Sequence, residues 1–499
     1  MRLKVKSLKL AAGRPVAILH AETAKKLAIY VNERVKINKI MNKKGSIIAI
    51  VDTAKGILKE NEIALSAEVF DYLKLKENES VEVYAAGRPK STYYISEKLN
   101  GKELDYARLY LIIKDIVENA LTESEIAYFI SGIYVHGMTL KETAALTTAI
   151  VKTGKKLDID KAKIVDKHSS GGTAGNRTTP IIVSICASAG LVMPKTSSRA
   201  ITSAAGTADT IECISDVEFT TKEMRKIVNK TNGCMVWGGS LGLAPADDKI
   251  IQVERILSLD PEAQLLASIL AKKLSVNAHY VLIDIPCGNT AKLSVEGAKE
   301  LEKKFQYLGN FFGLKLKTIL TDGSQPIGNG IGPVLEMRDV LAVLRREKNR
   351  PMDLEKKSLL LSGILLEMTG KAKKGEGNKL ALEILNSKEA YKKFEQIIKA
   401  QKGSLDPKVL EKKLMLAEKK VKIRALKAGK IKVINNKKIS AIARAAGCPS
   451  DKSAGIYLYK HVGDDVKQGD IIMEIYSKTS YKLLDAKKLC EQICPIVIG

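Results

Sequence analysis

The first 88 residues alternate between hydrophobic and polar positions with the period of two that is typical of β-strands. Such runs cover residues 35–37, 46–51 and 80–84, and turn-forming residues such as Gly45 and Asn78 separate them. The pattern predicts a β-rich domain over residues 1–88. We expect this domain to serve assembly of the protein, because every candidate site residue identified below lies beyond it.

Helical periodicity begins near residue 100. Residues 104–119 place their apolar side chains on one face of a helix (Leu109, Ile112, Ile113 and Ile116). Two capping-box patterns, Thr122 with Glu125 and Thr139 with Glu142, precede further apolar-periodic runs. Residues 100–154 are therefore predicted to form a helical domain.

Strand and helix patterns then alternate. Residues 162–165 predict a strand that enters a glycine-rich loop at residues 167–173. Thr179 and Pro180 predict the start of a helix, and residues 191–193 predict a second strand that enters a polar loop. In such a βαβ unit both loops lie at the carboxyl edge of a parallel sheet, where ligands bind.

Beyond residue 340 the pattern predicts amphipathic helices over 358–368 and 380–399, and a β-rich segment from Lys430. Residues 462–470 have the turn spacing of barrel-sandwich modules and hold no lysine in a prosthetic-group turn, so we interpret this segment as structural. The chain is thus predicted to be an α/β protein: an N-terminal β-rich domain, a small helical domain, a large α/β domain with a parallel-rich sheet, and a C-terminal barrel-sandwich-like module.

Composition narrows the class of protein. With 499 residues, 45% hydrophobic and 28% charged, the chain is typical of a globular protein of two to four domains. Its seven cysteines show no metal-ligand spacing, which favours reduced thiols in the cytoplasm and predicts no metal or cofactor. The net charge of +26 indicates anionic substrates. A nucleic-acid-binding protein is the non-enzymatic alternative, although aromatic residues, at 5%, do not interleave with the basic ones.

The two loops of the βαβ unit carry the candidate chemistry. Residues 166–172, DKHSSGG, combine a lysine, two hydroxyls and two glycines that let backbone N–H groups approach an anion. The lysine precedes the glycines, so this is not a Walker loop. Residues 197–209, SSRAITSAAGTAD, add five hydroxyls and an arginine. A phosphate-binding edge is the prediction.

These two segments resemble the signature of thymidine and pyrimidine-nucleoside phosphorylases, and residues 322–328 leading to Glu336 resemble that family too. The core also resembles anthranilate phosphoribosyltransferase. The resemblance implies a discontinuous helical domain of residues 100–154 plus 246–276. It further implies a phosphate-binding α/β domain of 160–245 plus 277–345 and a C-terminal helical and β-rich domain of 346–499.

Residue by residue, the resemblance implies four ligands of inorganic phosphate, with Thr178 as a further candidate: Lys167, Ser169, Ser197 and Thr207. It implies that Ser268 and Lys272, four residues apart on one helix face, bind the base. It places His168 beside the sugar as a second catalytic candidate, although a structural histidine remains an alternative.

One position departs from the pyrimidine enzymes. Their base-reading arginine is replaced by Val253, and Arg255 lies on roughly the opposite side of the helix. Together with the N-terminal domain, this resembles the archaeal-type AMP phosphorylases, which convert AMP and phosphate into adenine and ribose 1,5-bisphosphate. That resemblance implies Asp260 as the proton donor, a homodimer or larger homo-oligomer, and a set of nucleotide contacts: Gly172, Ser198, Arg199, Ala200, Ile201, Thr202, Ser203, Thr207, Ser268, Lys272 and Lys292.

Two alternative enzyme functions remain, and Asp260 has an alternative structural role. A pyrimidine-nucleoside phosphorylase would use thymidine or uridine instead of AMP. A phosphoribosyltransferase would need magnesium, for which Asp247 and Asp248 are the nearest acidic pair. Asp260 precedes Pro261 and is also a good helix N-cap, so its role as an acid rests on the resemblance alone.

Overall fold

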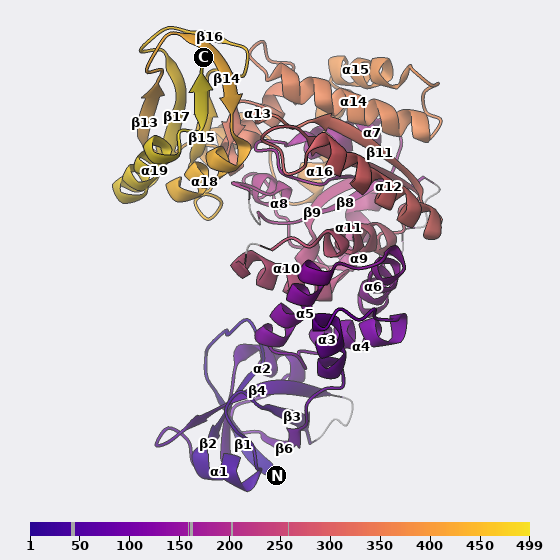
Figure 1. Ribbon diagram of the computed structural model, residues 1–499, viewed down its shortest axis with the longest axis vertical. Coiled ribbons are helices and arrows are strands. Elements are labelled where there is room, and N and C mark those ends of the chain that lie inside the picture. Colours follow the sequence, from indigo (N-terminus) through magenta and orange to yellow (C-terminus); the bar gives the residue numbers. More distant parts are fainter. Residues whose placement is uncertain (41–44, 158, 160–162, 201–202, 258) are drawn as a thin grey trace. The chain divides into compact units, whose positions relative to one another are not determined.

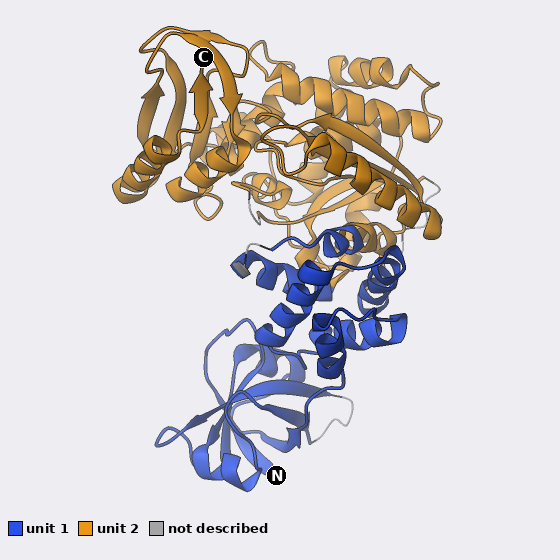
Figure 2. Cartoon of the chain, viewed as in Figure 1, with its two compact units in different colours: residues 1–154, 245–268 blue, residues 155–244, 269–499 orange. Residues whose placement is uncertain are grey.

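The computed structural model describes residues 1–499 except 41–44, 158, 160–162, 201–202 and 258 (Figure 1). The chain divides into two compact units, which we describe separately (Figure 2). Unit 1 comprises Met1–Gly154 and Pro245–Ser268, and unit 2 comprises Lys155–Ala244 and Ile269–Gly499. Among the described residues no helix is long and apolar enough to cross a membrane.

The N-terminal part of unit 1 is a closed barrel of six strands in the order β1-β5-β2-β4-β3-β6. Alternate residues such as Val35, Ile37, Val81 and Val83 are fully buried in its core, which explains the period-two pattern and confirms the predicted β-rich fold. Its elements are β1 (Arg2–Ser7), β2 (Val16–His20), α1 (Ala21–Lys26), β3 (Arg34–Lys39), β4 (Ser46–Ala54), β5 (Glu62–Leu65), α2 (Ala67–Leu73) and β6 (Ser80–Ala86).

The rest of unit 1 is helical. Both predicted capping boxes are confirmed: the Thr122 hydroxyl accepts from the Glu125 N–H at 3.2 Å while the Glu125 carboxylate accepts from the Thr122 N–H at 2.7 Å, and Thr139 and Glu142 repeat the arrangement. Helix α10 packs against α4 and α5 although more than 100 residues separate them. The helices are α3 (Ser91–Leu99), α4 (Tyr106–Val117), α5 (Glu123–His136), α6 (Leu140–Thr153), α10 (Pro245–Leu257) and the first half of α11 (Glu262–Ser275).

Unit 2 is built on parallel strands. One sheet has the order β11-β10-β7, and β8 pairs with β9. A parallel bridge between Ile164 and Val192 joins the two sheets, so β7 and β8 are neighbours as the βαβ pattern predicted. The elements of this part are β7 (Val165–Ser169), α7 (Thr178–Ser188), β8 (Met193–Ser197), α8 (Thr207–Ile211), α9 (Thr221–Thr231), β9 (Gly233–Trp237), η1 (Gly238–Ser240), β10 (Tyr280–Cys287), α12 (Val295–Phe311), β11 (Lys315–Asp322), β12 (Gly330–Ile331) and α13 (Pro333–Arg345).

Two boundaries differ from the prediction. Strands β7 and β8 start later and include the polar residues that we expected in loops; part of the first predicted strand lies outside the described residues. The charged side chains Asp166, Lys167 and Lys195 are tolerated in the strands because buried groups of opposite charge pair with them. Thr179 is not a helix cap, because α7 begins at Thr178 and Arg177 occupies the N-cap position without a side-chain cap bond.

Four helices follow: α14 (Met352–Met368), α15 (Gly377–Asn386), α16 (Glu389–Ala400) and α17 (Pro407–Lys413). The single helix predicted over 380–399 is wrong, because Lys388 adopts a φ of 63° and separates α15 from α16. Helices α14 and α16 pack against α7 (Figure 1). Their leucines and isoleucines belong to the same hydrophobic core as β7 and α13, so one core extends across the predicted boundary at residue 346.

The remaining residues form what we call the C-terminal module, residues 419–498. Two sheets, β15-β17-β13 and β16-β14-β18, surround a second hydrophobic core, which confirms the predicted β-rich module. Strand β12, which precedes the module in the chain, extends the first sheet beside β15. Its first strand, β13, precedes the predicted start at Lys430. The elements are β13 (Lys419–Arg424), β14 (Gly429–Ile434), α18 (Asn436–Ala446), β15 (Gly455–Leu458), β16 (Asp465–Val466), β17 (Ile471–Ser477), α19 (Ser480–Ile493) and β18 (Ile496–Ile498).

Candidate active site

The carboxyl ends of β7 and β8 bring the two predicted loops together in unit 2. The bridge between Ile164 and Val192 places Ser169 and Ser197 at matching positions, each five residues further along its parallel strand. The Lys195 ammonium also donates to the Lys167 carbonyl at 2.8 Å, which links the two strands close to their ends. The prediction that both loops share one sheet edge is therefore confirmed.

Lys167 lies on one face of β7 and is 2% exposed. Its ammonium donates to the Thr178 hydroxyl at 3.0 Å and lies 3.7 Å from the Asp284 carboxylate on β10. Lys357 of α14 also lies 3.2 Å from that carboxylate. Burial lowers the pKa of Lys167 to about 8, although Asp284 partly opposes this effect.

Asp166 is on the opposite face of β7, because successive strand residues alternate. Its carboxylate is fully buried and accepts from Lys195 at 3.0 Å and from Lys273 of α11 at 2.7 Å. Burial alone would raise the pKa of Asp166, but the two lysine charges outweigh it and lower the pKa. Burial lowers the pKa of Lys273 to about 7.

Four buried lysines and only two buried aspartates lie on β7 or next to it: Lys167, Lys195, Lys273, Lys357, Asp166 and Asp284. Buried charge without full compensation is costly, and an anion that binds beside it is stabilised. The charge imbalance therefore favours anion binding at this end of the strand.

The glycine loop turns sharply after β7. Gly171 and Gly172 have φ of 88° and 89°, which glycine adopts without strain. A Cβ on Gly172 would lie 2.5 Å from the Lys292 Cβ, so only glycine lets the loop approach that lysine. The predicted contacts Gly172 and Lys292 therefore lie side by side.

Several hydroxyls near the two loops are buried without a partner. Among the described residues, the side-chain oxygens of Ser170, Thr173 and Thr196 have no hydrogen-bond partner in the protein, and Ser170 and Thr196 are 5% and 4% exposed. Because a buried unsatisfied hydroxyl costs free energy, such groups in a native structure call for a further partner. An oxyanion would supply acceptors for them.

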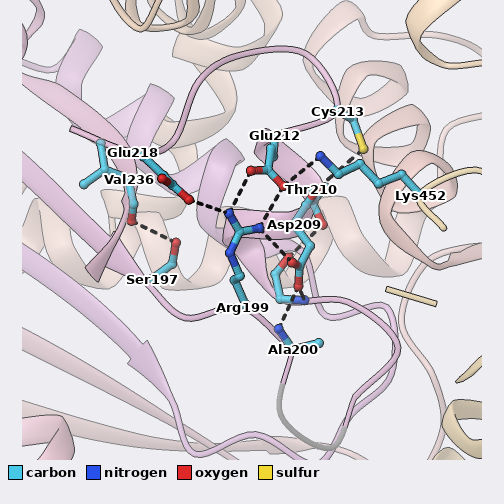
Figure 3. A network of polar contacts seen from close by, with 11 residues as sticks. Ser197, Arg199, Ala200, Asp209, Thr210, Glu212, Cys213, Glu218, Val236 and Lys452 are labelled. Atoms are coloured by element: carbon cyan, nitrogen blue, oxygen red, sulfur yellow. Dashed lines mark hydrogen bonds and ion pairs between the residues drawn. The ribbon is translucent and has the colours of Figure 1, made fainter. Parts of the chain in front are cut away.

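Loop 197–207 is held at both described ends, whereas Ile201 and Thr202 lie outside the described residues. The Asp209 carboxylate accepts from the N–H group of Ala200 at 2.7 Å (Figure 3). It also accepts from the N–H group of Gly206 at 2.8 Å. The Ser197 hydroxyl donates to the Val236 carbonyl at 3.2 Å, and the Ser203 hydroxyl to the Ala205 carbonyl at 2.9 Å.

Arg177 closes the far end of this loop and was missed in the sequence. Its guanidinium donates to the Thr207 hydroxyl at 2.8 Å, to the Ala205 carbonyl at 2.8 Å and to the Glu336 carboxylate at 2.6 Å. The arginine next to Thr178 could have signalled such a role, but its partners lie 28 to 159 residues away.

The Arg199 side chain is held by contacts within the protein. Its guanidinium makes two bonds to Glu212 at 2.7 and 2.8 Å and one to Glu218 at 3.0 Å (Figure 3). It also lies 4.9 Å from the ring centroid of Trp237. These contacts fix the side chain of Arg199, which is predicted to contact the nucleotide.

His168 lies at the register position opposite Ile283 and is half-buried. Burial, together with the charges of Lys273 and Lys195, lowers its pKa well below the ordinary value. The imidazole is therefore neutral at pH 7. It can donate or accept a hydrogen bond but does not carry the proton of a cationic acid.

The remaining candidate residues lie on α10, on α11 and in the segment between these helices. In unit 1 the Ser268 hydroxyl donates to the buried Asp247 carboxylate at 2.8 Å, and the Gln264 amide donates to it at 3.2 Å. Val253 is buried in unit 1 and Arg255 is exposed. Exposed Asp260 lies two residues before the first helical residue of α11, and Lys272 lies on the last turn of that helix, in unit 2.

Within the part of the chain that the structure describes, no group of histidine, cysteine, aspartate or glutamate side chains is placed to hold a metal ion. Asp247 of the acidic pair that we considered for magnesium is instead bonded to Ser268 and Gln264.

Comparison with known families matches three parts of the chain. The helical bundle domain of the glycosyl transferase family matches residues 92–154, and the a/b domain of that family matches residues 161–391. The pyrimidine nucleoside phosphorylase C-terminal domain matches residues 430–496.

Full-length relatives include proteins named AMP phosphorylase. Those of Thermococcus kodakarensis and Pyrococcus furiosus are each 42% identical over 499 residues, covering all of this chain and 98% of each relative. That of Methanococcus aeolicus is 41% identical over 498 residues, covering 99% of this chain and 97% of the relative.

A solved structure adds the fold alone. Anthranilate phosphoribosyltransferase from Thermus thermophilus superposes with a TM-score of 0.51 at 17% identity, covering 62% of this chain and 99% of the other. The family resemblance of the two loops and the predicted α/β fold class are therefore confirmed.

Proposed function

The chain belongs to the AMP phosphorylase family, and from this premise we propose that it cleaves AMP with inorganic phosphate, releasing adenine and ribose 1,5-bisphosphate. It is then a pentosyltransferase, in agreement with the glycosyl transferase domain. The observation that carries the proposal is the shared strand edge, where buried lysines outnumber buried aspartates and hydroxyls lack partners.

The substrates explain why such an edge is needed. AMP and inorganic phosphate are both anions, and their mutual repulsion opposes binding in one site. Lys167 with Ser169 supplies a cation and a hydroxyl at one strand end, and Ser197 with Thr207 supplies two hydroxyls from the other loop. We assign these four groups to inorganic phosphate, and Gly172 with Lys292 to the nucleotide.

In the proposed reaction a phosphate oxygen bonds to C1′ of the ribose while the bond from C1′ to the base nitrogen breaks. The electron pair of that bond stays with adenine, which is a poor leaving group as an anion. Protonation of the base by Asp260 lowers this barrier, and general-acid catalysis typically contributes about 10²–10⁴-fold. Neutral His168 positions the sugar by hydrogen bonding, while Ser268 and Lys272 bind the base.

Val253 supports a nucleotide rather than a pyrimidine nucleoside as the substrate. It is 5% exposed and apolar, so this position has no guanidinium to donate to a pyrimidine carbonyl. The hydroxyls that the sequence places at residues 198 and 202 are instead the candidate donors for a 5′-phosphate, while the Ser203 hydroxyl donates to the Ala205 carbonyl.

The test is a comparison of substrates on the full-length protein. With inorganic phosphate present, we expect AMP to release free adenine and adenosine and thymidine to release no base, as measured by chromatography. Activity is expected to persist in excess chelator. Equal turnover of adenosine would contradict the nucleotide assignment, and loss of activity restored by magnesium would favour a phosphoribosyltransferase.

The seven cysteines support a cytoplasmic location, because all are free thiols and six of them are buried. We propose in addition a homodimer or larger homo-oligomer, as the resemblance implies. Light scattering of the full chain and of a variant lacking residues 1–84 tests whether the N-terminal barrel serves assembly, in which case truncation reduces the oligomer size.

A further inference from the structure

The C-terminal module reaches the glycine loop through Asn436, the first residue of α18. This side chain is 1% exposed, and its amide oxygen accepts from the Ala174 N–H at 2.9 Å. Its amide nitrogen donates to the Thr290 hydroxyl and to the Gly323 carbonyl, both at 2.9 Å. Thr290 precedes Lys292 by two residues. Ala174 directly follows the glycine loop, so one buried amide ties the end of this loop to the segment that approaches it.

The module also reaches loop 197–207, through Lys452. Its ammonium lies 2.7 Å from a Glu212 oxygen, and the same oxygen accepts from Arg199 at 2.7 Å (Figure 3). The backbone of Lys452 is itself fixed, since its carbonyl accepts from the Val334 N–H at 3.1 Å. The two cations lower the pKa of Glu212 to about 2, so the carboxylate that joins them is ionised at neutral pH.

An apolar contact accompanies this ion pair. Ala204, within loop 197–207, is 2% exposed and belongs to the hydrophobic core of the C-terminal module, together with Ile431 and Ile456. The loop is thus joined to the module by packing on one side and by the Arg199, Glu212 and Lys452 network on the other.

We propose that the C-terminal module is a positioning element of the active site, in which Asn436 orients the glycine loop and Lys452 orients loop 197–207 through Glu212 and Arg199. This inference rests on the proposed function, because it takes the two loops as the binding site for AMP and phosphate. Neither residue has to touch the substrate. A displaced loop raises the KM because its donors no longer meet the substrate oxygens.

Trp237 supplies a measurement that does not depend on activity. It is the single tryptophan of the chain and lies 4.9 Å from the Arg199 guanidinium. Tryptophan emission and its quenching by acrylamide therefore report whether Arg199 keeps its place.

The decisive variant is Lys452→Met in the full-length protein, which keeps the side-chain stem and removes the charge. We expect altered Trp237 emission. We also expect the KM for AMP to rise up to about fivefold, because a partly exposed ion pair contributes that much, while kcat stays nearly unchanged. Lys452→Arg keeps the charge and is expected to show the Trp237 emission and the KM of the unmodified protein. The matched control is Lys420→Met. This variant removes a 3.5 Å ion pair between Lys420 and Glu474, which lies in the same module and involves neither loop.

Unchanged emission and unchanged KM in Lys452→Met would overturn the proposal. If the unmodified protein releases no adenine from AMP, the proposed function fails, while the emission of Lys452→Met still decides whether the module positions the loop. Asn436→Asp is the second variant, because it keeps the amide's size but replaces two donors. It is expected to lower kcat/KM at least tenfold and to leave Trp237 emission unchanged.

Discussion

Adding a single methyl group to the glycine loop provides a sharp test of the site geometry. Gly171 and Gly172 both have φ near +88°, where an alanine costs about 1–2 kcal/mol. They differ in their surroundings. A Cβ on Gly171 meets no atom within 4 Å, whereas a Cβ on Gly172 lies 2.5 Å from the Lys292 Cβ and 2.8 Å from its backbone nitrogen. Gly171→Ala is therefore a matched control that contains the strain without the clash.

The size of the effect follows from that distance. Carbon atoms in contact prefer about 3.5–4.0 Å, so Gly172→Ala must separate the loop from Lys292 by about 1 Å. A displacement of about 1 Å at an active site can reduce the rate about 100-fold. We expect Gly172→Ala to lower kcat/KM for AMP about 100-fold and Gly171→Ala to lower it no more than about tenfold. Both should lose conformational stability from the shared strain, and Gly172→Ala should lose more because the clash with Lys292 adds about 1–3 kcal/mol.

The assay is the initial rate of adenine release at varied AMP and fixed saturating phosphate, with thermal unfolding of both variants measured in parallel. If both variants lose activity equally, backbone strain alone explains the loss and the contact with Lys292 has no role. A fully active Gly172→Ala would show that the loop is not part of the site.

Three further predictions concern charged residues. Asp260→Asn should lower turnover by about two orders of magnitude in rate assays while AMP still binds, because asparagine keeps the size of the side chain but donates no such proton. Since the pKa of Lys167 is about 8, its cation is lost as pH rises, so kcat/KM for phosphate should fall about tenfold per pH unit above that value; a flat profile to pH 10 would contradict its role. Asp166→Asn leaves Lys195 and Lys273 without their carboxylate and should destabilise the protein by about 3–5 kcal/mol in denaturant unfolding.

The order of elements was predictable because hydrophobic periodicity reflects which face of each element is buried. Both capping boxes and the βαβ unit with its two loops followed from local sequence alone. The polar end of β7 did not. Lys167 and His168 resemble loop residues in sequence, yet they continue the strand, because Lys167 is paired with Asp284, more than 100 residues away.

The supporting residues of the site were missed for the same reason. Arg177, Asp166 and Asn436 act through partners that are distant in the chain, and a single sequence carries no signal of such pairing. The sequence does contain a weak signal for the buried position of Lys273. This lysine is on the apolar side of α11, where a charged side chain needs a buried partner. The positions implied by the family resemblance, such as Asp260 as the proton donor, stay predictions.

The two β-rich parts of the chain protect their sheets against intermolecular strand pairing in different ways. The six-stranded barrel closes on itself, so its described strands leave no edge for a foreign strand to extend. In the C-terminal module, one edge of the sheet β12-β15-β17-β13 is β13, whose exposed residues include Lys419, Lys420 and Lys422. A second copy that docked along this edge would bring like charges together. Part of the large positive charge thus discourages aggregation, and self-association through the barrel has to use side-chain surfaces instead of backbone hydrogen bonds.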